Sequence, residues 1–111
     1  MGDLTTESAS RMEPGANVAS PQDREEMQQL ARAEQLLSTQ PAKTLRLARD
    51  GETQFPRGYF RQERRYLEVM ALLALGQRSE AGTYARWFLR DYPTGPYRKK
   101  IALALQVDLP P

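Results

Sequence analysis

Arginines gathered around two aromatic residues near the middle of the chain are the residues best suited to bind another molecule. The cluster consists of Arg57, Tyr59, Phe60, Arg61, Arg64 and Arg65. Guanidinium groups bind carboxylates and phosphates, and aromatic rings stack on bases or anchor peptide side chains. Arg61 and Arg65 are four residues apart, which places them on one face of a helix with Arg64 at its edge.

This arginine cluster has four open interpretations. It is the solvated start of a helix, a surface for an acidic protein or peptide, a phosphate contact for nucleic acid, or an internal partner for acidic residues near the N-terminus. Nucleic acid is the disfavoured ligand, and the steep loss of phosphate binding with salt distinguishes it from the others.

The second candidate contact is Trp87, which is the single tryptophan of the chain. It lies between Arg86 and Arg90, off the apolar stripe of its own helix. It either packs against a neighbouring helix or anchors a partner, because tryptophan and arginine dominate the binding energy of protein interfaces.

Residues for catalysis are sparse. The chain has no cysteine and no histidine, so it lacks thiol nucleophiles, the side chain that titrates near neutral pH, and the commonest transition-metal ligands. Glu63, Tyr66, Glu68 and Lys99 show no spacing that is diagnostic of an acid–base pair. We therefore expect no enzymatic activity, no cofactor and no metal site.

Five helices must position these residues. Proline directly after Ser20 and after Gln40 marks two helix starts, and the spacing of apolar residues continues each pattern. The predicted helices cover residues 21–37, 41–54, 60–75, 79–91 and 97–106. Gly51 is expected inside the second helix, and Gly76 is expected to end the third in a left-handed conformation.

The apolar stripes predict which helix faces point inward. From 66 to 75 only Glu68 is polar, so this segment is predicted to be the buried, central part of the fold. The inward residues expected elsewhere are Met27, Leu30, Ala33 and Leu37; Ala42, Leu45, Ala48 and Phe55; Ala81, Tyr84, Ala85, Phe88, Leu89 and Tyr92; and Tyr97, Ile101, Ala104 and Leu105.

The ends of the chain differ from its middle. Residues 1–19 are rich in small and polar residues and are expected to form a disordered arm, followed by a helical domain over 20–108 and a tail at 109–111. Residues 1–56 carry a net charge of −3 and residues 57–111 a net charge of +5. The two halves therefore attract each other or a second copy of the chain.

A repeat explains the stretch RDYPTGPYRKK, residues 90–100. Phe55-Pro56 and Tyr92-Pro93 are 37 residues apart, and each pair follows a predicted helix. Antiparallel helix pairs that recur at such a period are typical of helical solenoids. The prolines and the glycine are therefore interpreted as the boundary between two helices rather than as a phosphate site.

The second unit, LLALGQRSEAGTYARWFLRDYP, resembles the tetratricopeptide repeat in the placing of Gly76, Ala81 and Pro93. The stretch ARWFLRDYPTGPYRKKIALAL is similar to bacterial envelope tetratricopeptide-like proteins of the Tol-Pal coordinator and outer-membrane assembly lipoprotein type, and to repeat domains attached to membrane-anchored regulators. In this register Arg65 and Glu68 stand where the family usually has core residues. The resemblance implies a stack of short helix pairs that binds proteins.

We therefore expect an all-α, short tetratricopeptide-like solenoid of about five antiparallel helices that serves as a non-catalytic scaffold or adaptor. One face of helices 21–37 and 60–75 is expected to bind a protein or acidic peptide partner. The alternative is a homo-oligomerisation element completed by a second copy, and a small basic RNA-binding protein is less favoured. The predicted contact residues are Arg57, Tyr59, Arg61, Arg64, Arg65, Trp87 and Arg90.

No run of apolar residues reaches the length of a membrane span, and the polar N-terminus lacks the apolar segment of a signal peptide. The sequence as written therefore predicts a cytoplasmic location without direct membrane insertion. A periplasmic location is expected if the chain is a fragment of a larger envelope protein.

Overall fold

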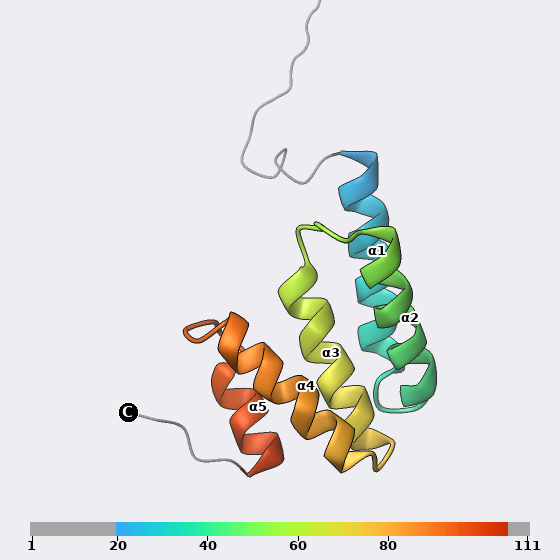
Figure 1. Cartoon of the computed structure of the whole chain (residues 1–111). Helices are drawn as coiled ribbons and strands as arrows, with labels where there is room; N and C mark the ends of the chain where they lie inside the picture. Colours follow the sequence, from blue (N-terminus) through green and yellow to red (C-terminus); the bar gives the residue numbers. More distant parts are fainter. Residues whose placement is uncertain (1–19, 107–111) are drawn as a thin grey trace, which may run out of the picture.

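The computed structural model describes residues 20–106, and within this range it contains five helices and no strand (Figure 1). The helices are α1 (Pro21–Leu36), α2 (Pro41–Gln54), α3 (Arg61–Ala74), α4 (Arg78–Asp91) and α5 (Arg98–Leu105). The all-α class predicted from the sequence is confirmed. The arm expected at 1–19 and the tail expected at 109–111 lie outside the described residues.

Local signals in the sequence explain where the helices begin and end. Pro21 opens α1, and the Ser20 hydroxyl accepts a hydrogen bond of 3.0 Å from the Asp23 N–H. Gly76 follows α3 with φ of +78°, a conformation that glycine adopts without strain. Its N–H and that of Gln77 donate to the carbonyls of Leu73 and Leu72, which closes the last turn.

Helix α3 is the centre of the fold, as its apolar sequence predicts. It packs against all four other helices, with α1 and α2 on one side of it and α4 and α5 on the other (Figure 1). Leu72 of α3, Phe88 of α4 and Ile101 of α5 are almost completely buried in the shared apolar core. The apolar core therefore consists mainly of residues of α3, α4 and α5, with Leu45 from α2.

The inward faces of α1 and α2 differ from the predicted ones at one position each, whereas Ala33, Leu45, Ala48 and Phe55 are buried as predicted. Met27 and Ala42 were expected inside but are exposed, whereas their neighbours Glu26 and Thr44 are buried. Both buried polar side chains have partners: the Thr44 hydroxyl donates a hydrogen bond of 2.7 Å to the Ala33 carbonyl, and Glu26 meets an arginine described below. Satisfied hydrogen bonds allow polar residues to replace apolar ones on a buried face.

The C-terminal helices follow the prediction more closely. Ala81, Ala85 and Phe88 of the α4 stripe are buried, but in α5 Ala102 is buried more deeply than the expected Ala104. Residues 92–97 separate α4 from α5, as expected for a helix boundary, although α5 begins at Arg98 rather than at the predicted Tyr97. Within residues 20–106, no helix combines the length and the apolar character needed to cross a membrane.

Candidate functional site

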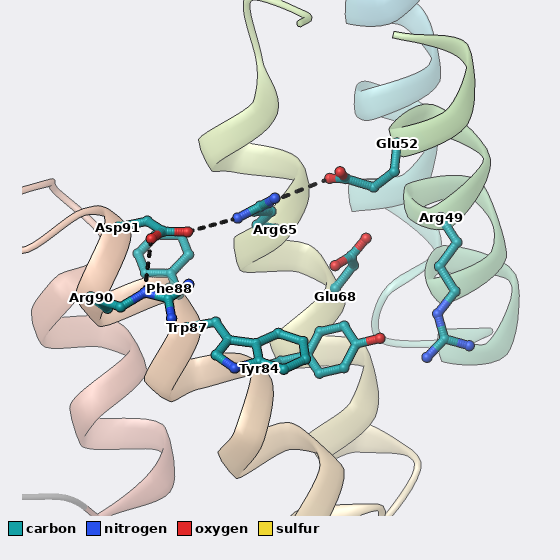
Figure 2. Close-up of a pocket in the computed structure, with 9 residues that line it drawn as sticks. All are labelled: Arg49, Glu52, Arg65, Glu68, Tyr84, Trp87, Phe88, Arg90 and Asp91. Carbon is teal, nitrogen blue, oxygen red and sulfur yellow. Dashed lines mark hydrogen bonds and ion pairs between the residues drawn. The ribbon is translucent and has the colours of Figure 1, made fainter. Parts of the chain in front are cut away.

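A cleft with a volume of about 430 Å³ opens between α2, α3 and α4 (Figure 2). Its lining residues are Arg49, Glu52, Arg65, Glu68, Tyr84, Trp87, Phe88, Arg90 and Asp91. Helical spacing explains why they meet, because residues three or four apart share a face. Arg49 and Glu52 on α2, and Arg65 and Glu68 on α3, are such pairs, whereas α4 contributes a longer row from 84 to 91.

Aromatic side chains of α4 form one wall of the cleft. The ring centroids of Tyr84 and Trp87 are 5.3 Å apart, and Trp87 keeps 48% of its surface exposed. The guanidinium of Arg49 lies 6.0 Å from the centre of the Tyr84 ring, within range of a cation–π interaction. Trp87 therefore offers the free aromatic surface on this side of the cleft.

Arginines at the cleft are held by carboxylates of the same chain. Arg65 pairs with Asp91 at 3.0 Å and approaches Glu52 at 3.7 Å, and Arg90 pairs with Asp91 at 3.1 Å (Figure 2). The hydrogen bond from Arg90, followed by the charges of Arg90 and Arg65, lowers the pKa of Asp91. Arg49 pairs at 3.0 Å with Glu80, which does not line the cleft.

Glu68 differs from the other charged residues of the cleft because its carboxyl is not paired. The residue is only 5% exposed, and its side chain points from α3 into the cleft between Glu52 and Arg49 (Figure 2). Among residues 20–106, none forms a hydrogen bond or an ion pair with this carboxyl. Burial, and then repulsion from Glu52, raise its pKa to about 7.

Arg64 is not an exposed contact, contrary to its predicted role. It is 2% exposed and lies in the interior, where it donates to Glu26 at 2.7 Å, to the Phe55 carbonyl at 3.0 Å and to Glu52 at 3.2 Å. Glu26 also accepts a hydrogen bond of 3.2 Å from the Phe60 N–H. Arg64 therefore ties α1, α2 and α3 together.

The predicted arginine cluster does not form one surface. Arg57 and Tyr59 are exposed in the connection between α2 and α3, and the Tyr59 ring makes an edge contact of 5.0 Å with Phe60. Arg61 is partly buried, and its Nε has no hydrogen-bond partner. Of the predicted contacts, the structure brings together Arg65, Trp87 and Arg90, all of which line the cleft.

Six residues that line the cleft were not predicted as contacts, namely Arg49, Glu52, Glu68, Tyr84, Phe88 and Asp91. Tyr84 and Phe88 were predicted as inward residues of α4, and in the structure Phe88 is buried and Tyr84 partly buried while both also line the cleft. The useful signal was Glu68, the single polar residue between 66 and 75. A lone acid in an apolar run either finds a buried partner or faces an opening.

Comparison of the chain with protein-family models, with curated proteins and with solved structures gave no match.

Proposed function

We propose that this chain is a non-catalytic protein-interaction module in which tetratricopeptide-like, antiparallel helix pairs form a short solenoid. In this proposal the cleft between α2, α3 and α4 receives a segment of a partner protein. The observation that carries the proposal is the half-exposed Trp87 next to Tyr84 in a cleft of about 430 Å³. Exposed tryptophan in a concave site is typical of interface anchors.

A repeat of 37 residues supports the solenoid part of the proposal. Helix α2 (Pro41–Gln54) and helix α4 (Arg78–Asp91) have equal length and are offset by 37 positions at both ends. The residues after the two helices have nearly the same backbone angles, with φ of −130° and ψ of 63° at Phe55 and φ of −130° and ψ of 66° at Tyr92. Equal units joined by short connections favour stacked antiparallel pairs.

Buried residues repeat with the same period. Thr44 and Ala81 are both fully buried, and Ala48 and Ala85 four residues later are both buried. Small side chains at these positions let α2 approach α1 and let α4 approach α3, which is the packing that the family resemblance implies. The cleft then lies over α3, between the second helices of the two pairs, rather than on the expected face of helices 21–37 and 60–75.

The hydrogen bonds among the cleft residues favour binding over catalysis, because they pair no nucleophile with a base. A nucleophile needs a base within hydrogen-bonding distance. Among the lining residues, the side-chain hydrogen bonds join arginines to carboxylates, and none joins the Tyr84 hydroxyl to Glu68 or Asp91. The proposed module is therefore non-catalytic.

A peptide-binding screen tests this proposal. The full chain is applied to an array of random decapeptides, and the affinities of the bound peptides are compared with those of Trp87→Ala. Loss of a central tryptophan is expected to weaken binding by a factor of about 30. Met27→Ala is the control because Met27 is an exposed apolar residue of α1 that does not line the cleft. Peptides that bind both variants equally well contradict the proposed site.

Self-association is a second candidate because one apolar side chain is exposed on the outer edge of the fold. Leu103 of α5 is 81% exposed. A helical stack of fewer than three repeat units leaves an end uncovered, which favours pairing with a second copy through the α5 surface that carries Leu103. Sedimentation equilibrium over a hundredfold range of concentration is the test, with Leu103→Gln as the variant. A mass equal to one chain at every concentration excludes this candidate.

A further inference from the structure

We propose that the partner places a basic side chain, lysine or arginine, in the cleft, with its cationic group against the Glu68 carboxyl and its aliphatic part along Trp87. This inference rests on the proposed function because it specifies the chemistry of the partner at the same cleft. It differs from the acidic partner that the arginine-rich sequence suggested.

Charge pairing around the cleft is the first argument. Six charged side chains line it, and five of them already have an oppositely charged neighbour within 4 Å. The paired residues are Arg49, Glu52, Arg65, Arg90 and Asp91. Glu68 is the exception among these lining residues. The charge that the cleft lacks is therefore a cation, not an anion.

The position of Glu68 is the second argument. Its side chain is almost entirely removed from solvent, yet its carboxyl faces the open cleft (Figure 2). A buried carboxylate without a partner is unfavourable, whereas an incoming cation supplies both charge and hydrogen-bond donors. An incoming carboxylate instead meets the negative charges of Glu52, Glu68 and Asp91, and the arginines near it are already neutralised by acids of the same chain.

The aromatic wall is the third argument. Trp87 and Tyr84 stand on the α4 side of the cleft, opposite α2, with Glu68 on the α3 side (Figure 2). A flat aromatic face accommodates the methylene groups of lysine or arginine and attracts their charge. Arg49 already occupies the neighbourhood of Tyr84, so Trp87 is the surface left for a partner.

Binding of a cation at this place is expected to depend on pH. The charged and titratable groups around Glu68 are Arg49 and Glu52 of α2, Arg64 and Arg65 of α3, and Tyr84, Arg90 and Asp91 of α4. Because the pKa of Glu68 is about 7, the free protein gains the negative charge between pH 6 and pH 8. Affinity for a basic peptide should therefore rise about tenfold over this range.

The test uses array peptides that bind the full chain and their neutral isosteres, in which each arginine is replaced by citrulline and each lysine by acetyl-lysine. Neutralising one basic residue is expected to weaken binding at least tenfold at pH 8. Glu68→Gln should cause the same loss for the unmodified peptides, remove the pH dependence, and leave binding of the neutral peptides unchanged. Circular dichroism checks that the variant is folded.

Glu25→Gln is the matched control because it makes the same chemical change on an exposed position of α1. It should leave both affinity and pH dependence as they are. The chain has no histidine, so no imidazole titrates in this pH range.

Three outcomes overturn the inference. Peptides that need Trp87 but bind equally well after neutralisation, or that prefer acidic residues, refute the basic partner and leave the proposed function intact. Basic peptides that bind Glu68→Gln as tightly as the original protein place the cation elsewhere. Failure of every array peptide to bind at the cleft refutes both proposals together.

Discussion

Two glutamates are buried in this small helical protein, and their surroundings are opposite. Glu26 is 2% exposed and forms an ion pair of 2.7 Å with Arg64 as well as a hydrogen bond with the Phe60 N–H. Glu68 is 5% exposed and has no such partner among the described residues. One carboxyl is enclosed by the protein that satisfies it, whereas the other faces a cleft.

This difference suggests two roles for a buried glutamate: Glu26 stabilises the fold through its ion pair, whereas Glu68 is available to a ligand of the cleft. The ion pair of Glu26 and Arg64 fits because two nearby residues, Gly51 and Gly58, have no side chain. A Cβ at Gly51 would overlap Arg64, and a Cβ at Gly58 would overlap the Glu26 carboxyl. At Glu68, the surrounding arginines are bound to other acids. Four predictions test whether this contrast holds, from the largest expected effect to the smallest.

Replacing Arg64 should destabilise the protein most. Arg64→Met leaves Glu26 buried without its cation, and breaking a buried pair in this way costs about 3–5 kcal/mol of unfolding free energy. Urea denaturation followed by circular dichroism measures the loss. Arg49→Met is the matched control, because the exposed pair of Arg49 and Glu80 should contribute about 1 kcal/mol or less. Equal losses in the two variants contradict the structural role of Arg64.

Ionisation of Glu68 should lower the unfolding free energy of the protein as the pH rises. Its pKa in the folded protein, about 7, exceeds its ordinary value of 4.5, so the folded state binds the proton more tightly. The unfolding free energy should therefore fall by about 3 kcal/mol, on an order-of-magnitude scale, between pH 4.5 and pH 8. The measured quantity is the difference between the original protein and Glu68→Gln at each pH, which removes the titration of groups common to both.

The sign of the stability change caused by Glu68→Gln tests the contrast with Glu26 directly. Glu68→Gln should make the protein more stable at pH 8 and leave it nearly unchanged at pH 4.5. A variant that is less stable at pH 8 means that the Glu68 carboxylate has a stabilising partner, which refutes the contrast with Glu26.

Glycines in two helices provide a third test. A Cβ at Gly51 would lie 2.5 Å from Cδ of Arg64 and 2.8 Å from an oxygen of Gln29, and Arg64 cannot move without losing its acceptors. Gly51→Ala should therefore lower the unfolding free energy by about 1–2 kcal/mol, because overpacking exceeds the gain in helix propensity.

Gly82→Ala in α4 is the matched comparison. The nearest atom to its Cβ is 3.7 Å away on Arg86, an ordinary contact. Here only the helix propensity changes, so stability should rise by about 0.5–1 kcal/mol. Thermal unfolding of both variants shows whether the signs differ. A stabilising alanine at Gly51 means that the space around Arg64 is larger than described.

Local residues made the five helices predictable. Proline at the start of α1 and α2, Gly76 after α3 and the stripe of Ala81, Ala85 and Phe88 act within one or two turns, so a single sequence reveals them. The inward face of α1 was predicted correctly at Ala33 but wrongly at Met27, because Met27 is apolar and the buried Glu26 is not. Glu26 is buried because Arg64, 38 positions further on, folds over it.

The cleft was harder to predict for a related reason. Trp87, Arg65 and Arg90 were recognised by residue type, but their meeting place depends on how α2, α3 and α4 cross. Arg64 and Arg65 are neighbours in sequence, yet one enters the interior and the other the cleft, since adjacent residues on a helix point about 100° apart. Pairing of each arginine with a distant acid is a tertiary property that composition does not reveal.

Glu52 connects the two glutamates and gives the last prediction. Its carboxylate lies 3.2 Å from Nε of Arg64 and 3.7 Å from Nε of Arg65, and its charge is the second cause of the raised pKa of Glu68. Glu52→Gln should therefore lower the pKa of Glu68, but only part of the way to 4.5, because burial is the larger cause and remains. Carbon-detected NMR titration of the side-chain carboxyls measures this pKa.

The same variant should weaken the Arg64 site only slightly. Arg64 keeps Glu26 and the Phe55 carbonyl, and Glu52 is partly exposed, so the expected loss of stability is about 1 kcal/mol or less. Asp50→Asn, on an exposed position of the same helix, should change neither quantity. If Glu52→Gln leaves the pKa of Glu68 in place, burial alone sets it. The cleft is then electrically independent of the Arg64 site, and the two glutamates differ only in whether the protein encloses them.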